Sequence, residues 1–223
     1  MCGRVIRTSS AEVLRQTFDL ASLPDDLRDR YNLAPTDPIP VIRSAPAPRR
    51  LELLRWGLKM SDGRMAGVNV RVESLSRPIY RDNVRDRRCL VIVDGFYEWR
   101  AIGGKKFPYV IAREDKAPMA LAGIYDANDC CAILTAKSQG IVATLHDRMP
   151  VMLADSAFAT WLDRRVKDVR PLLAATTADG LICYPVSRAV NSVKNDDARL
   201  LERVPDPECE PPRGSTLPLF GAS

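Results

Sequence analysis

The sequence has little that would build a metal site or a disulfide scaffold. Its 223 residues include one histidine, His146, and six cysteines, none of which form a CxxC pair. A zinc finger needs a cluster of thiolate and imidazole ligands, and a disulfide-rich domain needs cysteines that can pair. Both classes are therefore disfavoured, and we expect no bound metal and no cofactor.

Long apolar runs are also missing. No segment approaches the roughly 18–20 apolar residues of a membrane-spanning helix. The first residues, Met1-Cys2-Gly3-Arg4-Val5, lack the apolar stretch and the small-residue cleavage site of a secretory signal. We therefore expect a reduced cytosolic protein without a membrane partner, in which most cysteines are small buried hydrophobic residues.

The apolar pattern predicts a mixture of strands and helices. Residues 89–93 are apolar throughout, which is typical of a strand buried on both faces. Ser9 and Glu12 have the spacing of a capping box and predict a helix near 10–19, and Asp155 is expected to cap a helix over 155–162. A third helix is predicted at 169–175, and further strands at 40–43, 51–56, 107–112, 119–125, 131–135, 151–153 and 182–186.

These elements predict the α+β class. We expect a single mixed domain over residues 2–205, with short strands forming a barrel-like core and helices at its periphery. The stretch from Val204 to Ser223 has five prolines together with Gly and Ser, a composition typical of flexible chain. Residues 206–223 are therefore expected to form a flexible, Pro-rich tail.

Positive charge is concentrated in one part of the sequence. Residues 41–100 have 13 Lys and Arg against 7 Asp and Glu, whereas the chain as a whole has a formal net charge of +5. Most of these cations are arginines, whose planar guanidinium groups suit phosphate oxygens. The charge thus favours a polyanionic partner such as nucleic acid. A solvated arginine-rich surface would give the same count.

The position of Cys2 offers a special chemistry. If Met1 is removed, Cys2 presents a thiol and a free α-amine on neighbouring carbons, with ordinary pKa values of about 8.5 and about 7.7–8. Such an aminothiol can condense with an aldehyde to an imine, and the sulfur can then close a five-membered thiazolidine ring. The alternative is that Cys2 merely follows the initiator methionine.

Three further places present polar groups suited to catalysis or binding. Glu98 lies between two aromatic residues just after the buried strand, and partial desolvation would favour its use as an acid or base. His146 precedes Asp147 and Arg148 on an expected loop, as a positioned acid or base would. Residues 69–73 alternate polar and apolar, so an extended strand there would align its three polar side chains on one face. Each pattern also fits an ordinary structural role.

Seven motifs in this sequence occur in the order typical of the SOS-response-associated peptidase (SRAP) family, whose members shield abasic sites in DNA. The resemblance spans about residues 2–205. The motifs are Met1–Arg4 (MCGR), Tyr31–Thr36 (YNLAPT), Arg55–Leu58 (RWGL), Asn69–Glu73 (NVRVE), Arg88–Leu90 (RCL), Gly95–Trp99 (GFYEW) and His146–Pro150 (HDRMP).

The resemblance implies a function and a set of catalytic residues in a protein of the bacterial cytosol. Cys2, freed by removal of Met1, would capture the ring-opened sugar of an abasic site in single-stranded DNA as a thiazolidine. Asn69 would hold that sugar, Glu98 would assist the proton transfers, and His146 would stabilise the opened sugar. The family name also implies a peptidase activity, most simply self-removal of Met1.

The same resemblance implies which residues contact DNA. Arg4 and Arg71 would grip the backbone, and Trp56 and Trp99 would stack on bases. The sequence departs from the family at Lys59-Met60-Ser61, where many members have a proline and a second tryptophan, at Val70 and at Lys137-Ser138. Two other classes stay open: an amidohydrolase with Cys2 as N-terminal nucleophile, and a single-strand binding module without catalysis.

Overall fold

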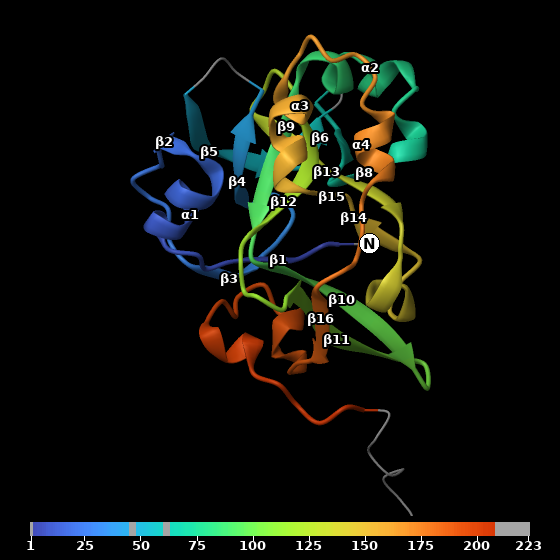
Figure 1. Ribbon diagram of the computed structural model, residues 1–223. Helices are drawn as coiled ribbons and strands as arrows, with labels where there is room; N and C mark the ends of the chain where they lie inside the picture. Colours follow the sequence, from blue (N-terminus) through green and yellow to red (C-terminus); the bar gives the residue numbers. More distant parts are fainter. Residues whose placement is uncertain (1, 45–47, 60–62, 208–223) are drawn as a thin grey trace, which may run out of the picture.

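The computed structural model describes residues 2–44, 48–59 and 63–207. These residues form one sheet of nine strands, one of five strands and a pair of short strands, with a few short helices around them (Figure 1). The predicted α+β class is therefore confirmed. Strands outnumber helices because most apolar segments of the chain are short and are buried in sheets.

The larger sheet closes into a ring. Strand β13 pairs in antiparallel with β12 and in parallel with β5, so β12, β9, β4, β5 and β13 follow one another around a circle. This ring is the predicted barrel-like core. The nine strands of the sheet are β2 (Leu20–Ser22), β4 (Pro38–Arg43), β5 (Arg49–Trp56), β8 (Asn69–Arg71), β9 (Arg88–Val93), β12 (Met119–Tyr125), β13 (Cys130–Lys137), β14 (Arg148–Pro150) and β15 (Met152–Leu153).

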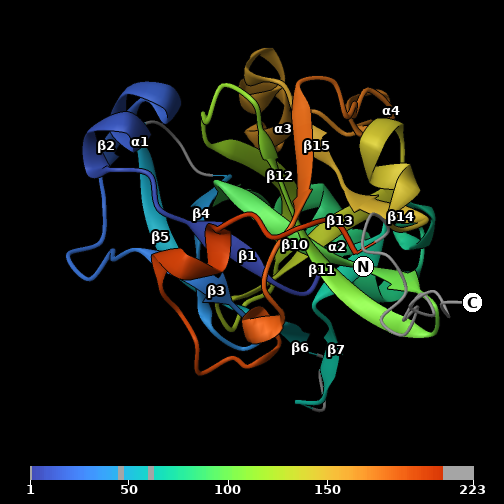
Figure 2. The same cartoon turned by 90° about the horizontal axis from the view of Figure 1, so that it is seen from below.

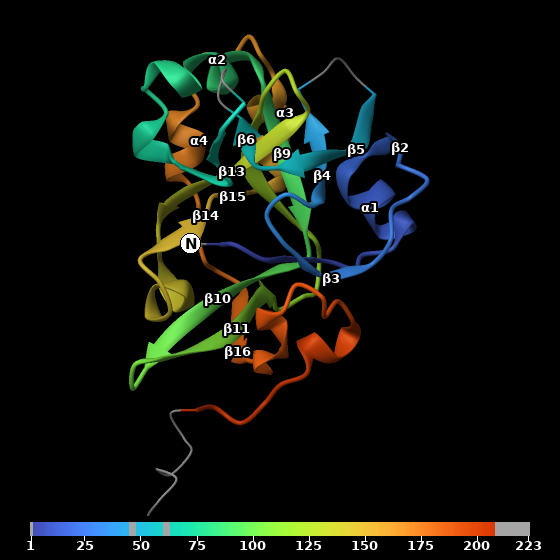
Figure 3. The same ribbon diagram turned by 180° about the vertical axis from the view of Figure 1, so that it is seen from behind.

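The smaller sheet lies at the opposite end of the molecule from α2, α3 and α4 (Figures 1 and 3). Its strand order is β16-β11-β10-β1-β3, so the first strand of the chain lies between β10 and β3, as the view from below shows (Figure 2). These strands are β1 (Val5–Arg7), β3 (Arg30–Leu33), β10 (Gly95–Ile102), β11 (Lys105–Arg113) and β16 (Leu181–Pro185), and the separate pair is β6 (Leu58–Lys59) with β7 (Met65–Gly67).

Strand β9 separates two apolar cores. All six of its residues are buried, which confirms the prediction for the 89–93 segment. Leu90 and Ile92 pack in one apolar cluster, whereas Cys89, Val91 and Val93 pack in another. Since neighbouring side chains of a strand point to opposite faces, an apolar run with no alternation is what a strand buried on both sides requires.

The helices are short and their caps differ from the prediction. Ser10, not Ser9, caps α1 by accepting a hydrogen bond from the Val13 N–H at 3.3 Å, because the Ser9 side chain is bound to Asp94. Asp155 opens a 3₁₀ turn without capping it. The helices are α1 (Ala11–Phe18), α2 (Pro78–Asp86), α3 (Phe158–Leu162) and α4 (Arg170–Ala174), with 3₁₀ turns η1 (Val72–Ser74), η2 (Gly140–Thr144), η3 (Asp155–Ala157), η4 (Arg188–Asn191) and η5 (Ala198–Leu201).

Two further predictions need correction or fall outside the described chain. The strand expected over 69–73 ends at Arg71, and Glu73 belongs to η1, where Arg148 holds it at 2.7 and 2.9 Å.

The structure describes only the first two residues of the tail predicted over 206–223. The first of them, Asp206, accepts a hydrogen bond from the Tyr109 hydroxyl at 3.2 Å. The rest of the predicted tail, from residue 208 onward, lies outside the described residues. Within those residues no helix is long and apolar enough to cross a membrane.

A buried arginine joins the helices to the ring. Arg88, at the start of β9, has no exposed surface, and its guanidinium donates to the carbonyls of Trp161 in α3, of Asp163 just after α3 and of Val84 in α2. Its guanidinium carbon also lies 5.6 Å from the centroid of the Trp161 ring. Burial lowers the pKa of Arg88. The carbonyl contacts replace the water that a buried cation loses.

We expect Arg88→Met to lower the free energy of unfolding by about 3 kcal/mol, because it leaves several buried carbonyl oxygens without a donor. The matched variant Arg81→Met, on the exposed face of α2, should change it by less than about 0.5 kcal/mol. Urea denaturation of both variants measures the difference. Equal stabilities would show that Arg88 contributes only its aliphatic stem.

Candidate active site

Strand pairing brings the start of the chain beside β10. Val5 pairs with Phe96 in antiparallel register, and the Tyr97 N–H donates to the Arg4 carbonyl at 3.0 Å. Since the two segments run in opposite directions, each residue before Val5 lies one position further along β10. Residues 2–4 therefore run toward Glu98.

Cys2 is held in place from a second sheet. Its side chain has no exposed surface, and its carbonyl accepts a hydrogen bond from the Asn69 Nδ2 at 2.6 Å. Asn69 opens β8, which pairs in parallel with β13 of the ring. Among the described residues, the other amide atom, Asn69 Oδ1, is buried without a hydrogen-bond partner. It is an acceptor on the side chain that holds the Cys2 backbone.

Burial governs the titration of the thiol. It raises the pKa of Cys2 well above its ordinary value, and the nearby charge of Glu98 raises it further. The thiol is therefore protonated at neutral pH in this state. A group beside it that accepts a proton is needed before the sulfur can act as a nucleophile.

Glu98 is a buried carboxyl group on the central part of β10. It is 2% exposed, and burial raises its pKa, while the neighbouring His146 lowers it in part. A raised pKa brings the protonated and ionised forms of a carboxyl group closer in population, which suits a group that must both donate and accept a proton. The β1–β10 register carries the residues before Val5 toward Glu98, and the charge of Glu98 raises the pKa of the Cys2 thiol.

His146 lies on the loop before β14 and is about one third exposed. Its Nδ1 is 2.9 Å from the Arg148 N–H and 2.8 Å from Asp147 Oδ1. The unprotonated Nδ1 can accept from the N–H, whereas only a protonated Nδ1 can donate to the carboxylate. The protonation state of the ring therefore decides which of the two contacts is a hydrogen bond.

A pocket of about 370 Å³ joins these groups. Four of the residues predicted from the sequence meet in its lining: Arg4, Glu98, Trp99 and His146. Lys106 of β11 and Asn191 of η4 complete the lining. The pocket thus combines an acid, an imidazole, two cations and one aromatic ring, while Cys2, two residues before Arg4, is buried and is not part of the lining.

The segment around η4 holds the pocket wall together. Arg4 donates to the carbonyl of Val190 and to Asn32 Oδ1, both at 2.8 Å, and to the Asn191 carbonyl at 3.3 Å. The indole N–H of Trp99 donates to Asn191 Oδ1 at 2.8 Å. These bonds fix the orientation of the Trp99 ring at the edge of the pocket.

The model of the family described as SOS response associated peptidase (SRAP) matches residues 1–193. The chain belongs to the SRAP family. The family resemblance inferred from the seven motifs is thereby confirmed.

Relatives named abasic site processing proteins match nearly the whole chain. YoqW of Bacillus subtilis is 33% identical, covering 91% of this chain and 99% of YoqW. YedK of Escherichia coli is 28% identical, covering 92% of this chain and all of YedK. A crystal structure of a Bordetella bronchiseptica protein superposes with a TM-score of 0.71 at 22% identity, covering 83% of this chain and all of that protein. This last likeness shows the SRAP fold.

Two of the predicted DNA contacts lie outside the pocket of this SRAP protein. Trp56 has no exposed surface, and its indole N–H donates to the Val68 carbonyl at 2.9 Å, so the prediction that it stacks on a base is wrong. A ring buried in the core has no free face to offer. Arg71 is exposed at the end of β8 but does not line the pocket.

Lys106 and Asn191 were missed as site residues. Lys106 follows the Gly103-Gly104 turn, and this turn indicates that β10 and β11 form a hairpin whose far strand lies beside Trp99. Asn191 is more than ninety positions from Trp99 in the sequence. No local pattern predicts such a contact.

Proposed function

We propose that this SRAP protein captures abasic sites in single-stranded DNA as a covalent thiazolidine on Cys2 and so shields the lesion. The observation that carries the proposal is the position of Cys2, whose carbonyl is bound by Asn69 and which lies two residues before Arg4, a residue in the wall of the pocket lined by Glu98 and His146. The names of the relatives support the same substrate class.

The reaction requires the free amine of Cys2 and therefore removal of Met1. The amine attacks the aldehyde carbon of the ring-opened sugar, and loss of one water gives an imine. The thiol then adds across the C=N bond, so that a C–S bond forms and the thiol proton passes to nitrogen. No electron acceptor is needed, because the atoms and electrons balance over this condensation and the addition that follows it.

The neighbouring side chains suit the proton movements. Glu98 protonates the departing oxygen and later accepts the thiol proton, a task that matches its raised pKa. His146 hydrogen-bonds the hydroxyl of the opened sugar from the pocket wall. Asn69 keeps the Cys2 backbone fixed, and its unpartnered Oδ1 accepts from the new amine or the sugar.

The pocket rim suits a single strand of DNA. Arg4 and Lys106 provide positive charge for the phosphates on either side of the lesion, and Arg71 contacts the backbone further along. Trp99, held by Asn191, offers a ring face to the neighbouring base. The buried Trp56 has no part in this contact.

The family description also contains the word peptidase, and self-removal of Met1 is the simplest activity of that kind. The Cys2 thiol can attack the carbonyl that precedes it, so that the acyl group moves from nitrogen to sulfur and water then hydrolyses the thioester. Such a step frees the amine that capture needs. We place both reactions in the bacterial cytosol, where the five described cysteines, all unpaired, stay reduced.

We expect Cys2→Ala to abolish covalent capture, because the ring closes through sulfur, and to leave DNA affinity within a few-fold. The assay incubates the protein with a single-stranded oligonucleotide whose uracil has been converted to an abasic site, and scores a heat-stable adduct on a denaturing gel. Intact mass reports whether Met1 is absent. An adduct of wild-type yield from the alanine variant would contradict the mechanism.

Two controls separate the competing classes. Cys2→Ser keeps the amine and should give only an imine that borohydride traps. Wild-type binding without any adduct would instead indicate a non-catalytic single-strand binding module. Turnover of an amide substrate without capture would indicate an amidohydrolase.

We expect Glu98→Gln to slow single-turnover capture by about 10²-fold or more, since the amide cannot move protons. Because Glu98 first gives and later takes a proton, the wild-type rate should fall on either side of its pKa, which burial raises, whereas the variant should keep only the fall at low pH that protonation of the Cys2 amine causes in both proteins. The same change at exposed Glu114 is the matched control. Identical pH profiles for wild type and Glu98→Gln would show that Glu98 only packs.

We expect single-stranded DNA to quench the fluorescence of Trp99 and of no other tryptophan. Trp56 and Trp161 have no exposed surface, whereas Trp99 lines the pocket. Titration with an abasic oligonucleotide at rising salt gives both the quenching and the affinity. In Trp99→Phe the quenching should vanish. If it persists unchanged, DNA binds away from this pocket.

A further inference from the structure

A second hollow of about 760 Å³ lies elsewhere on the molecule, and it shares no lining residue with the pocket beside Cys2. It is a groove walled by η1, α2, the end of β13 and α4. Its floor is aliphatic and consists of Val72, Leu75, Val84, Ala136, Val169 and Leu173.

The rim of this groove is positively charged. Lys137, Lys167 and Arg170 line it together with two carboxylates, Glu73 and Asp168. Both carboxylates are already bound by arginines: Arg148 holds Glu73, and Arg170 holds Asp168 at 2.8 Å.

The positive charge of the two lysines is therefore not neutralised by these two carboxylates. The Lys167 ammonium donates to the Arg164 carbonyl at 2.8 Å and is 3.9 Å from the nearest carboxylate, that of Asp86. Lys137 is exposed at the end of β13. An anionic group entering the groove would meet these two cations first.

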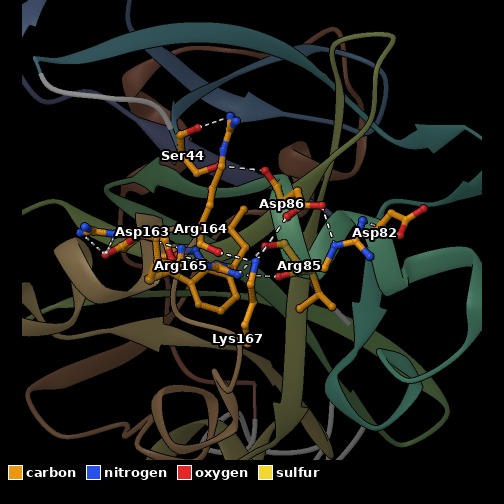
Figure 4. Close-up of polar contacts among 11 residues, drawn as sticks. Ser44, Asp82, Arg85, Asp86, Asp163, Arg164, Arg165 and Lys167 are labelled. Atoms are coloured by element: carbon orange, nitrogen blue, oxygen red, sulfur yellow. Dashed lines mark hydrogen bonds and ion pairs between the residues drawn. The ribbon is translucent and has the colours of Figure 1, made fainter.

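One wall of the groove belongs to a basic segment. Residues 163–170 have four Lys and Arg against two Asp, a net charge of +2, whereas α2 is neutral, with Arg81 and Arg85 against Asp82 and Asp86. The fold brings these distant segments together: Figure 4 shows Lys167 beside Asp86, and Arg164 reaching Ser44. An anionic partner is therefore attracted to this side of the molecule.

The chemistry of the floor distinguishes between two kinds of polyanion. Nucleobases are bound by aromatic rings and by hydrogen-bonding groups, as the pocket with Trp99 provides. No aromatic side chain lines the groove, and its floor offers only aliphatic surface. Aliphatic floors with basic rims complement peptide segments in which apolar anchors alternate with acidic residues.

We propose that this groove binds an acidic peptide segment of a partner protein, with apolar side chains on the floor and carboxylates at Lys137 and Lys167. The site is separate from the one that we propose for DNA capture, and the proposal does not depend on that function. It would let a partner protein hold this chain while the pocket beside Cys2 stays open.

The test measures binding of short fluorescein-labelled peptides made of Asp, Leu and Phe. In one set the apolar residues occupy every second position, as on one face of a strand, and in the other they are three and four positions apart, as on one face of a helix. Fluorescence anisotropy with the full chain should show saturable binding that weakens with salt. Lys137→Glu combined with Lys167→Glu should weaken it at least about tenfold, equivalent to about 1.4 kcal/mol. Ala174→Tyr, at an exposed residue of the rim, should block the groove and have a similar effect.

The control is Lys116→Glu, the same charge reversal at an exposed turn on another side of the molecule, which should leave binding within twofold. Peptides with Asn in place of Asp should bind more weakly than their acidic counterparts. The proposal is overturned if no peptide binds, or if Lys116→Glu weakens binding as much as the rim variants. It is also overturned if the rim variants reduce binding of an oligo-dT strand and not of the peptides, because the groove then belongs to the DNA path.

Discussion

The pairing of β1 with β10 is the constraint on which the site depends. Because Val5 lies opposite Phe96, the three residues before it must run along β10, and Cys2 arrives beside Glu98. Asn69 reaches the same point from the larger sheet, since β8 is anchored on β13. The start of the chain thus bridges the two sheets, and a shift of one residue in the β1 register would turn its side chains to the opposite face.

Burial gives the site its chemical character. Cys2 and Glu98 are almost completely shielded from water, and burial raises the pKa of both groups. The protonated thiol is inactive until a neighbouring group takes its proton. The same low polarity strengthens every hydrogen bond to a substrate that enters, because water no longer competes.

The arginines of residues 41–100 show why a charge count does not by itself locate a binding surface. Arg88 is wholly buried and bound by backbone carbonyls, and Arg43 is paired with Asp129 at 2.6 Å. Arg81, by contrast, is exposed on α2. The charges of α2 cancel, with Arg81 and Arg85 against Asp82 and Asp86, whereas the 163–170 segment has a net charge of +2 beside the aliphatic groove.

The sequence alone determined the α+β class, the central strand β9, the SRAP family and four side chains that meet at the pocket, because apolar runs and short motifs report on local structure. It did not determine that Trp56 is buried, since the presence of a tryptophan in the sequence does not tell whether its side chain lies in the core or at the surface. It also missed Lys106 and Asn191, and it missed α2, whose charged sequence has no apolar face of the usual width. These features were decided by contacts between segments far apart in the chain, such as Trp99 with Asn191 and Arg88 with Trp161. Such contacts depend on how the two sheets fold against each other, and no local pattern records that arrangement.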